Sequence, residues 1–138
     1  MYNDSITDLI ASYFESRPEV VAVYLFGSYA RGREKPFSDI DLGILLEHKA
    51  LSQIDELVTT YTVKLGRLLR KDFHVLIMNT AGETILSQIF KRRKCIFQRN
   101  PSLLSHFKTV SFSRIADYGF YRKSMERAFL SRILGGAK

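Results

Sequence analysis

The sequence predicts an α/β (α+β) fold in which helices flank a mixed sheet of about three or four strands, followed by a long C-terminal helical segment. Three observations support this prediction. Helical and strand-like apolar patterns alternate over residues 1–98. A glycine turn follows the first strand-like run, whereas aspartates open the second and the third. From about residue 99, apolar side chains recur at helical spacing.

Bulk properties indicate one globular domain. The chain has 138 residues, of which 46% are hydrophobic and 25% charged. We expect residues 1–98 to form the core of this single domain and residues 99–138 the helical segment. The single Cys95 excludes an internal disulfide, and the three histidines lack zinc-ligand spacing. Neither a signal peptide nor an apolar run of about 18 residues is evident, so we expect a soluble, cytoplasmic protein.

The first elements follow from their apolar patterns. A capping-box-like Ser5-x-x-Asp8 predicts a helix over residues 5–16, and Pro18 ends it. Residues 20–26 form a continuous β-branched and aromatic run, typical of a buried strand. Residues 39–46 predict the second strand, residues 52–69 an amphipathic helix, and residues 72–78 the third strand.

The remaining elements begin with Thr80-x-x-Glu83, a capping box that predicts another helix. Residues 95–97 then predict a short edge strand. Asn100-Pro101 is typical of a helix start, with asparagine as the N-cap. Gly119 is a candidate break in the long helix that follows. We expect the first half of this segment to pack on the sheet and the second half to contact another protein chain.

Residues 25–46 contain the pattern most indicative of chemistry, GS-x10-D-x-D. Gly27 allows a ligand to approach the backbone, and the N–H groups and hydroxyl at Ser28 suit a phosphate. Asp39 and Asp41 lie on one face of a strand because side chains alternate with period two. Two neighbouring carboxylates suit Mg²⁺, which prefers oxygen ligands. The alternative is a glycine turn followed by surface aspartates. A Walker loop is excluded because Arg33 and Glu34 follow Gly32.

The combination of GSYARG with SDIDL resembles the signature of the DNA polymerase β-like nucleotidyltransferases. The short length resembles the minimal members of that family, which act as antitoxins beside HEPN-domain toxins. The resemblance implies a Mg²⁺-dependent enzyme that uses ATP and two metal ions. It also assigns Gly27 and Ser28 to the β- and γ-phosphates and Arg31 to the leaving group, whereas Asp39 and Asp41 become metal ligands.

Asp72 opens the third predicted strand and resembles the third acidic residue of that family, so it is the third candidate metal ligand and catalytic residue. Its alternative is an exposed aspartate at the edge of a strand. His74 shares a face with Asp72 and could bind a phosphate or the acceptor, although a packed histidine is an equal alternative. For Ser28 to share a site with Asp39 and Asp41, the second strand must run antiparallel to the first. Asp72 then requires a third strand parallel to the second.

Three hypotheses describe the function that the resemblance implies. The leading one is a protein adenylyltransferase that transfers AMP from ATP to a hydroxyl, notably a tyrosine, of a HEPN ribonuclease toxin, and so acts as its antitoxin by AMPylation. The second is transfer to a small molecule such as an aminoglycoside. The third is a binding module that neutralises a toxin by contact alone.

The net charge of +7 does not select among these hypotheses. The basic residues are dispersed, and the cluster over residues 91–94 is typical of a solvated helix end. We therefore expect neither a requirement for nucleic acid nor a membrane partner.

Overall fold

The computed structural model describes residues 2–27, 39–92 and 94–135. Along the chain, the elements are α1 (Tyr2–Glu15), β1 (Val20–Phe26), β2 (Ile40–Leu46), the 3₁₀ helix η1 (His48–Gln53), α2 (Ile54–Leu69), β3 (Phe73–Ile77), the 3₁₀ helix η2 (Met78–Thr80), α3 (Glu83–Arg92), β4 (Cys95–Gln98) and α4 (Pro101–Gly135). The α/β class and the long C-terminal helix are thus confirmed.

The four-stranded sheet is mixed and has the strand order β3-β2-β1-β4. Strand β2 runs antiparallel to β1 and parallel to β3, and β4 runs antiparallel to β1. The strand directions required for a shared site are therefore confirmed. The C-terminal end of β1 and the N-terminal ends of β2 and β3 lie side by side, because Phe26 pairs with Asp41 and Asp41 pairs with His74. This end of the strands is called the aspartate edge of the sheet below.

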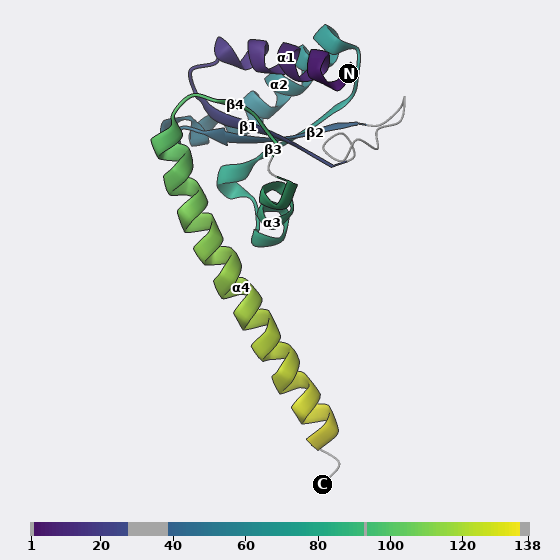
Figure 1. Ribbon diagram of the computed structural model, residues 1–138, viewed down its shortest axis with the longest axis vertical. Coiled ribbons are helices and arrows are strands. Elements are labelled where there is room, and N and C mark those ends of the chain that lie inside the picture. The colour runs from purple at the N-terminus through teal and green to yellow at the C-terminus, as the bar shows by residue number, and fades with distance from the viewer. Residues whose placement is uncertain (1, 28–38, 93, 136–138) are drawn as a thin grey trace.

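Helices cover both faces of the sheet, which gives three layers (Figure 1). Helices α1 and α2 lie on one face, and α3 lies on the other. Alternation along the strands divides the core accordingly: Val23 and Leu25 of β1 pack in the cluster beneath α1 and α2, whereas Tyr24 packs in the cluster beneath α3 and the start of α4. Each buried strand therefore contributes apolar side chains to two cores, which explains its continuous apolar run.

Several local expectations require correction. Helix α1 begins before Ser5, so Ser5 lies inside the first turn rather than at its cap. Thr80 belongs to η2 and donates to the carbonyl oxygen of Ile77 at 3.5 Å, and α3 begins only at Glu83. The capping-box prediction was wrong here because the chain makes a 3₁₀ turn directly after β3. Gly119 does not interrupt α4, in which it is an ordinary helical residue.

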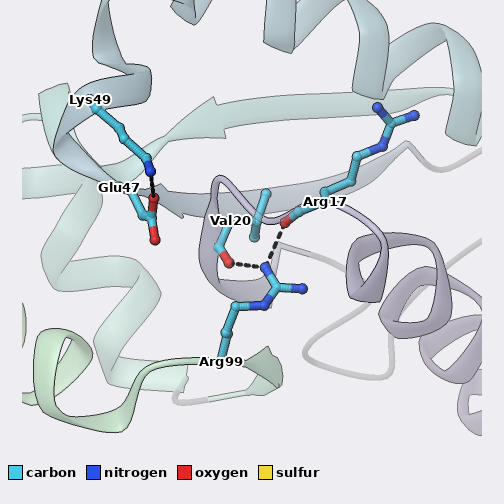
Figure 2. Close-up of polar contacts among 5 residues, drawn as sticks. All are labelled: Arg17, Val20, Glu47, Lys49 and Arg99. Atoms are coloured by element: carbon cyan, nitrogen blue, oxygen red, sulfur yellow. Dashed lines mark hydrogen bonds and ion pairs between the residues drawn. The ribbon is translucent and has the colours of Figure 1, made fainter.

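Arg99 joins the start of β1 to the end of α1 (Figure 2). Its guanidinium donates to the carbonyl oxygens of Arg17 and Val20, at 2.6 Å each. It also donates to those of Phe14 at 3.1 Å and Glu15 at 2.7 Å. Carbonyl groups in the last turn of a helix lack partners within the helix, and Arg99, directly after β4, donates to those of Phe14 and Glu15. The side chain therefore fixes α1 against the sheet. The nearby Glu47–Lys49 ion pair, at 3.4 Å, is solvent-exposed and contributes little to stability.

Helix α4 packs against the rest of the protein in its first half and is exposed in its second half. The prediction that Asn100 caps it is confirmed, because the Asn100 side chain accepts a hydrogen bond from the backbone N–H of Leu103 at 3.1 Å. Its first half packs mainly on α3, where Phe107 and Phe112 contact the ring of Phe90. Beyond this region the helix extends away from the sheet (Figure 1). Its second half exposes large apolar side chains, namely Phe120, Tyr121, Met125, Phe129, Leu130, Ile133 and Leu134.

Candidate active site

The strand register brings the three candidate aspartates to the same edge of the sheet. Asp41 lies in β2 opposite Phe26 on one side and His74 on the other. Asp39 and Asp72 immediately precede β2 and β3, and the backbone N–H of Ile40 donates to the carbonyl oxygen of Asp72 at 2.9 Å. This hydrogen bond places Asp72 beside residues 39–41. Alternation along β2 directs Asp41 away from Ile40 and Leu42, and so toward the face that carries α3.

Asp41 is the most enclosed of the three. Its side chain is 26% exposed, whereas Asp39 and Asp72 are both exposed to solvent. The Nδ1 atom of His74 lies 3.2 Å from Oδ1 of Asp41, within hydrogen-bonding distance. His74 is 64% exposed, so the alternative of a packed histidine is wrong. Sequence reasoning placed His74 on the face of Asp72 but missed its contact with Asp41, which depends on the pairing of strands 33 residues apart.

Gly27 lies directly against the carboxylate of Asp41. Its φ is +75°, in the left-handed region that favours glycine. A Cβ atom at this position would lie 2.1 Å from Oδ2 and 3.1 Å from Cγ of Asp41. No other residue type fits here without displacement of the carboxylate. The space that Asp41 occupies thus explains why the motif has glycine at this position.

The two other predicted phosphate-binding residues, Ser28 and Arg31, lie outside the described residues. Within residues 2–27, 39–92 and 94–135, no three histidine, cysteine, aspartate or glutamate side chains are close enough to hold a metal ion. The chemistry of the donors suits Mg²⁺, because aspartate oxygens are the ligands that this ion prefers. The roles of Asp39, Asp41 and Asp72 therefore stay predictions.

Lys94, the last residue of the basic cluster, comes near the same edge of the sheet. The backbone N–H of Leu25 donates to the carbonyl oxygen of Lys94 at 2.9 Å, two residues before Gly27.

A separate cavity of about 170 Å³ lies between β1, α3 and α4. Its lining contains none of the aspartates and consists of Tyr24, Phe90, Cys95, Lys108 and Phe112. Burial raises the pKa of the Tyr24 hydroxyl above its ordinary value. This cavity is therefore distinct from the aspartate edge.

The fold and the site define a class of protein. The family model described as Polymerase beta, Nucleotidyltransferase matches residues 8–102, which include the whole sheet and its aspartate edge. The chain therefore belongs to this nucleotidyltransferase family. A search of curated proteins by sequence finds no significant match.

Solved structures with the same fold come from toxin–antitoxin complexes. One is a toxin–antitoxin with AMP-PNP, with a TM-score of 0.66 and 19% identity over 93% of this chain and 98% of the other. A second contains the tri-AMPylated HEPN toxin of Shewanella oneidensis in complex with an MNT antitoxin, with a TM-score of 0.62 and 17% identity over 96% and 98%. A third is an MntA–HepT complex, with a TM-score of 0.60 and 16% identity over 95% and 98%. At these identities the likeness establishes the fold.

Proposed function

We propose that this protein is a Mg²⁺-dependent protein adenylyltransferase that transfers AMP from ATP to a tyrosine hydroxyl of a HEPN-type toxin and so neutralises it. The observation that carries the proposal is the position of Asp41. This carboxylate lies between Gly27 and His74, at the edge of the sheet where Asp39 and Asp72 also lie. ATP is an intracellular substrate, so a cytoplasmic location forms part of the same proposal.

The side chains at this edge have separate roles in the proposed transfer. Asp39, Asp41 and Asp72 would hold Mg²⁺, which neutralises triphosphate charge and lowers the pKa of an acceptor hydroxyl when bound. Asp72 takes the proton of that hydroxyl, whose oxygen forms a bond to the α-phosphorus of ATP. The bond between the α-phosphorus and the oxygen bridging to the β-phosphate breaks, and pyrophosphate leaves. Gly27 and Ser28 bind the β- and γ-phosphates, and Arg31 stabilises charge on pyrophosphate.

The second half of α4 supports the part of the proposal that concerns a protein partner. A shallow hollow of about 380 Å³ lies along it, lined by Tyr118, Tyr121, Arg122, Met125, Glu126 and Phe129. These residues continue the helix face whose earlier members, Leu104 and Ser111, are buried. An uncovered apolar face with aromatic and arginine residues is typical of a protein interface. In addition, the structures with the same fold are toxin–antitoxin complexes, one of them with an AMPylated toxin.

Two alternatives make different predictions. Transfer to a small molecule such as an aminoglycoside requires a second substrate site, and the described elements outside the sheet and its flanking helices are α4 and the short 3₁₀ helices η1 and η2. A protein that neutralises the toxin by contact alone requires α4 but not the aspartates. The partner is therefore the acceptor that we propose.

Transfer of a labelled AMP group tests this proposal. The purified protein is incubated with α-labelled ATP, Mg²⁺ and a HEPN-type toxin encoded beside its gene. The same reaction is run with Asp41→Asn and with Asp55→Asn, a matched control on α2. We expect label on the toxin with the natural protein and the control, and almost none with Asp41→Asn.

Each alternative has its own outcome in this experiment. Equal neutralisation of the toxin by the natural protein and Asp41→Asn, with no label on either toxin sample, would support the contact module. Label on an added aminoglycoside, with none on the toxin, would support small-molecule transfer. Either outcome contradicts protein AMPylation.

A further inference from the structure

The contact between His74 and Asp41 joins two side chains that the motif does not connect. They occupy paired positions of the parallel strands β2 and β3, so the pairing of the sheet holds their Cα atoms side by side. The contact is between Nδ1 and Oδ1, at 3.2 Å. The His74 side chain is 64% exposed and is therefore accessible from solvent.

The chemistry of the two groups defines the direction of the hydrogen bond. A carboxylate in its ionised form only accepts hydrogen bonds, so the tautomer of His74 that makes this bond carries its proton on Nδ1. The opposite oxygen of Asp41, Oδ2, lies against the Cα atom of Gly27, where no Cβ is present. The two oxygens of Asp41 thus have different neighbours, and each neighbour restricts rotation of the carboxylate.

We propose that His74 is a positioning residue of the candidate nucleotide site, because its bond to Asp41 holds that carboxylate in the orientation needed for a divalent cation. This inference rests on the proposed function, since it assigns Asp41 to the cation. Residues that hydrogen-bond a metal-binding group fix its orientation, and their loss typically weakens metal binding about 10- to 100-fold. Without His74, the Asp41 side chain gains rotational freedom that cation binding must remove.

Binding of Mn²⁺ alone, followed by the EPR signal of the free ion, tests the inference without any measure of activity. The matched variants are His74→Leu, which removes both ring nitrogens, and His74→Asn, whose amide nitrogen can take the place of Nδ1. A third variant, His74→Gln, extends its amide toward the place of Nε2 instead. The melting temperature of each variant shows whether it folds, and an exposed position such as His74 should change it little.

We expect Mn²⁺ affinity to fall about 10-fold or more in His74→Leu, to recover largely in His74→Asn and to remain low in His74→Gln. Unchanged or tighter binding by His74→Leu would overturn the inference, because the histidine would then be irrelevant to the cation or would compete with it. Recovery in His74→Gln but not in His74→Asn would also overturn it, because the outward nitrogen would then be the one that matters.

Asp41→Asn separates failure of this inference from failure of the proposed function. If Asp41→Asn loses Mn²⁺ binding while His74→Leu keeps it, the cation site stands and only the role of His74 is wrong. If Asp41→Asn binds Mn²⁺ as well as the natural protein does, the site assignment fails, and the role of His74 fails with it.

Discussion

Replacement of Gly27 by alanine perturbs the candidate site through a single added methyl group. Two effects act together. The backbone has φ of +75°, and this left-handed conformation costs a residue with a Cβ atom roughly 1–2 kcal/mol. The methyl group would also lie 2.1 Å from Oδ2 of Asp41, so the carboxylate must move by roughly 1 Å to reach ordinary contact distance.

Movement of the Asp41 carboxylate also disturbs its contact with His74, which is solvent-exposed and contributes at most about 0.5 kcal/mol to stability. The two effects together predict a loss of about 1–2.5 kcal/mol in the free energy of unfolding. For a chain of this size, the melting temperature should fall by roughly 3–10 °C. We expect Mn²⁺ binding to weaken in the same variant, because the displaced carboxylate is a candidate ligand.

Gly119→Ala provides the matched control for Gly27→Ala. A Cβ at Gly119 meets nothing within 4 Å, and the residue lies inside α4, where alanine is favoured over glycine by about 0.5–1 kcal/mol. Urea unfolding should therefore show a more stable protein with unchanged Mn²⁺ affinity. If Gly27→Ala matched the natural protein in both stability and Mn²⁺ affinity, the close contact between Gly27 and Asp41 would have no consequence, and the reasoning would be refuted.

Three further predictions concern other parts of the molecule. Arg99→Met removes four hydrogen bonds to backbone carbonyl groups and should lower the free energy of unfolding by about 2–4 kcal/mol in urea, whereas an effect below about 0.5 kcal/mol would contradict its bridging role. The pKa of Glu83 is lowered by a hydrogen bond to its own backbone N–H and by the contact with Arg114 at 2.7 Å. The contribution of these contacts to stability is therefore present above pH 4.5, the ordinary pKa, and is lost as the pH falls through the lowered pKa of the folded protein. Arg114→Gln should therefore reduce the loss of stability seen on acidification below about pH 4.5 in urea titrations, and an unaltered pH profile would argue against the pair. Phe129→Asp should abolish co-purification with the toxin, whereas Leu130→Asp, outside the hollow on α4, should not; equal retention by both would place the interface elsewhere.

The local sequence determined most of the elements. Strand β1 has the predicted bounds, because its continuous apolar run must be buried on both faces. The start of α4 also follows from local chemistry, since Asn100 and Pro101 favour a helix N-terminus wherever they occur. Even the directions of β1, β2 and β3 were predictable, from the requirement that the glycine turn and the aspartates share one edge.

Other features arise only when distant segments meet. The start of α3 was mispredicted because the 3₁₀ turn after β3 overrides the Thr80 cap signal. Arg99 contacts carbonyl groups more than 75 residues away, and no local pattern distinguishes it from a solvated arginine. The division into residues 1–98 and 99–138 and the roles of Ser28 and Arg31 stay predictions.

The contacts of Asp41 with His74 and Gly27 show most directly what the sequence determines and what depends on the tertiary structure. The sequence alone determined that aspartates alternate with apolar residues at the start of a strand, because alternation is a property of each strand by itself. Which oxygen of Asp41 meets His74, and why position 27 has no room for a side chain, depends on the register of β2 against β3 and β1. Register is set by burial of the whole sheet between its helices, and only the tertiary structure decided it.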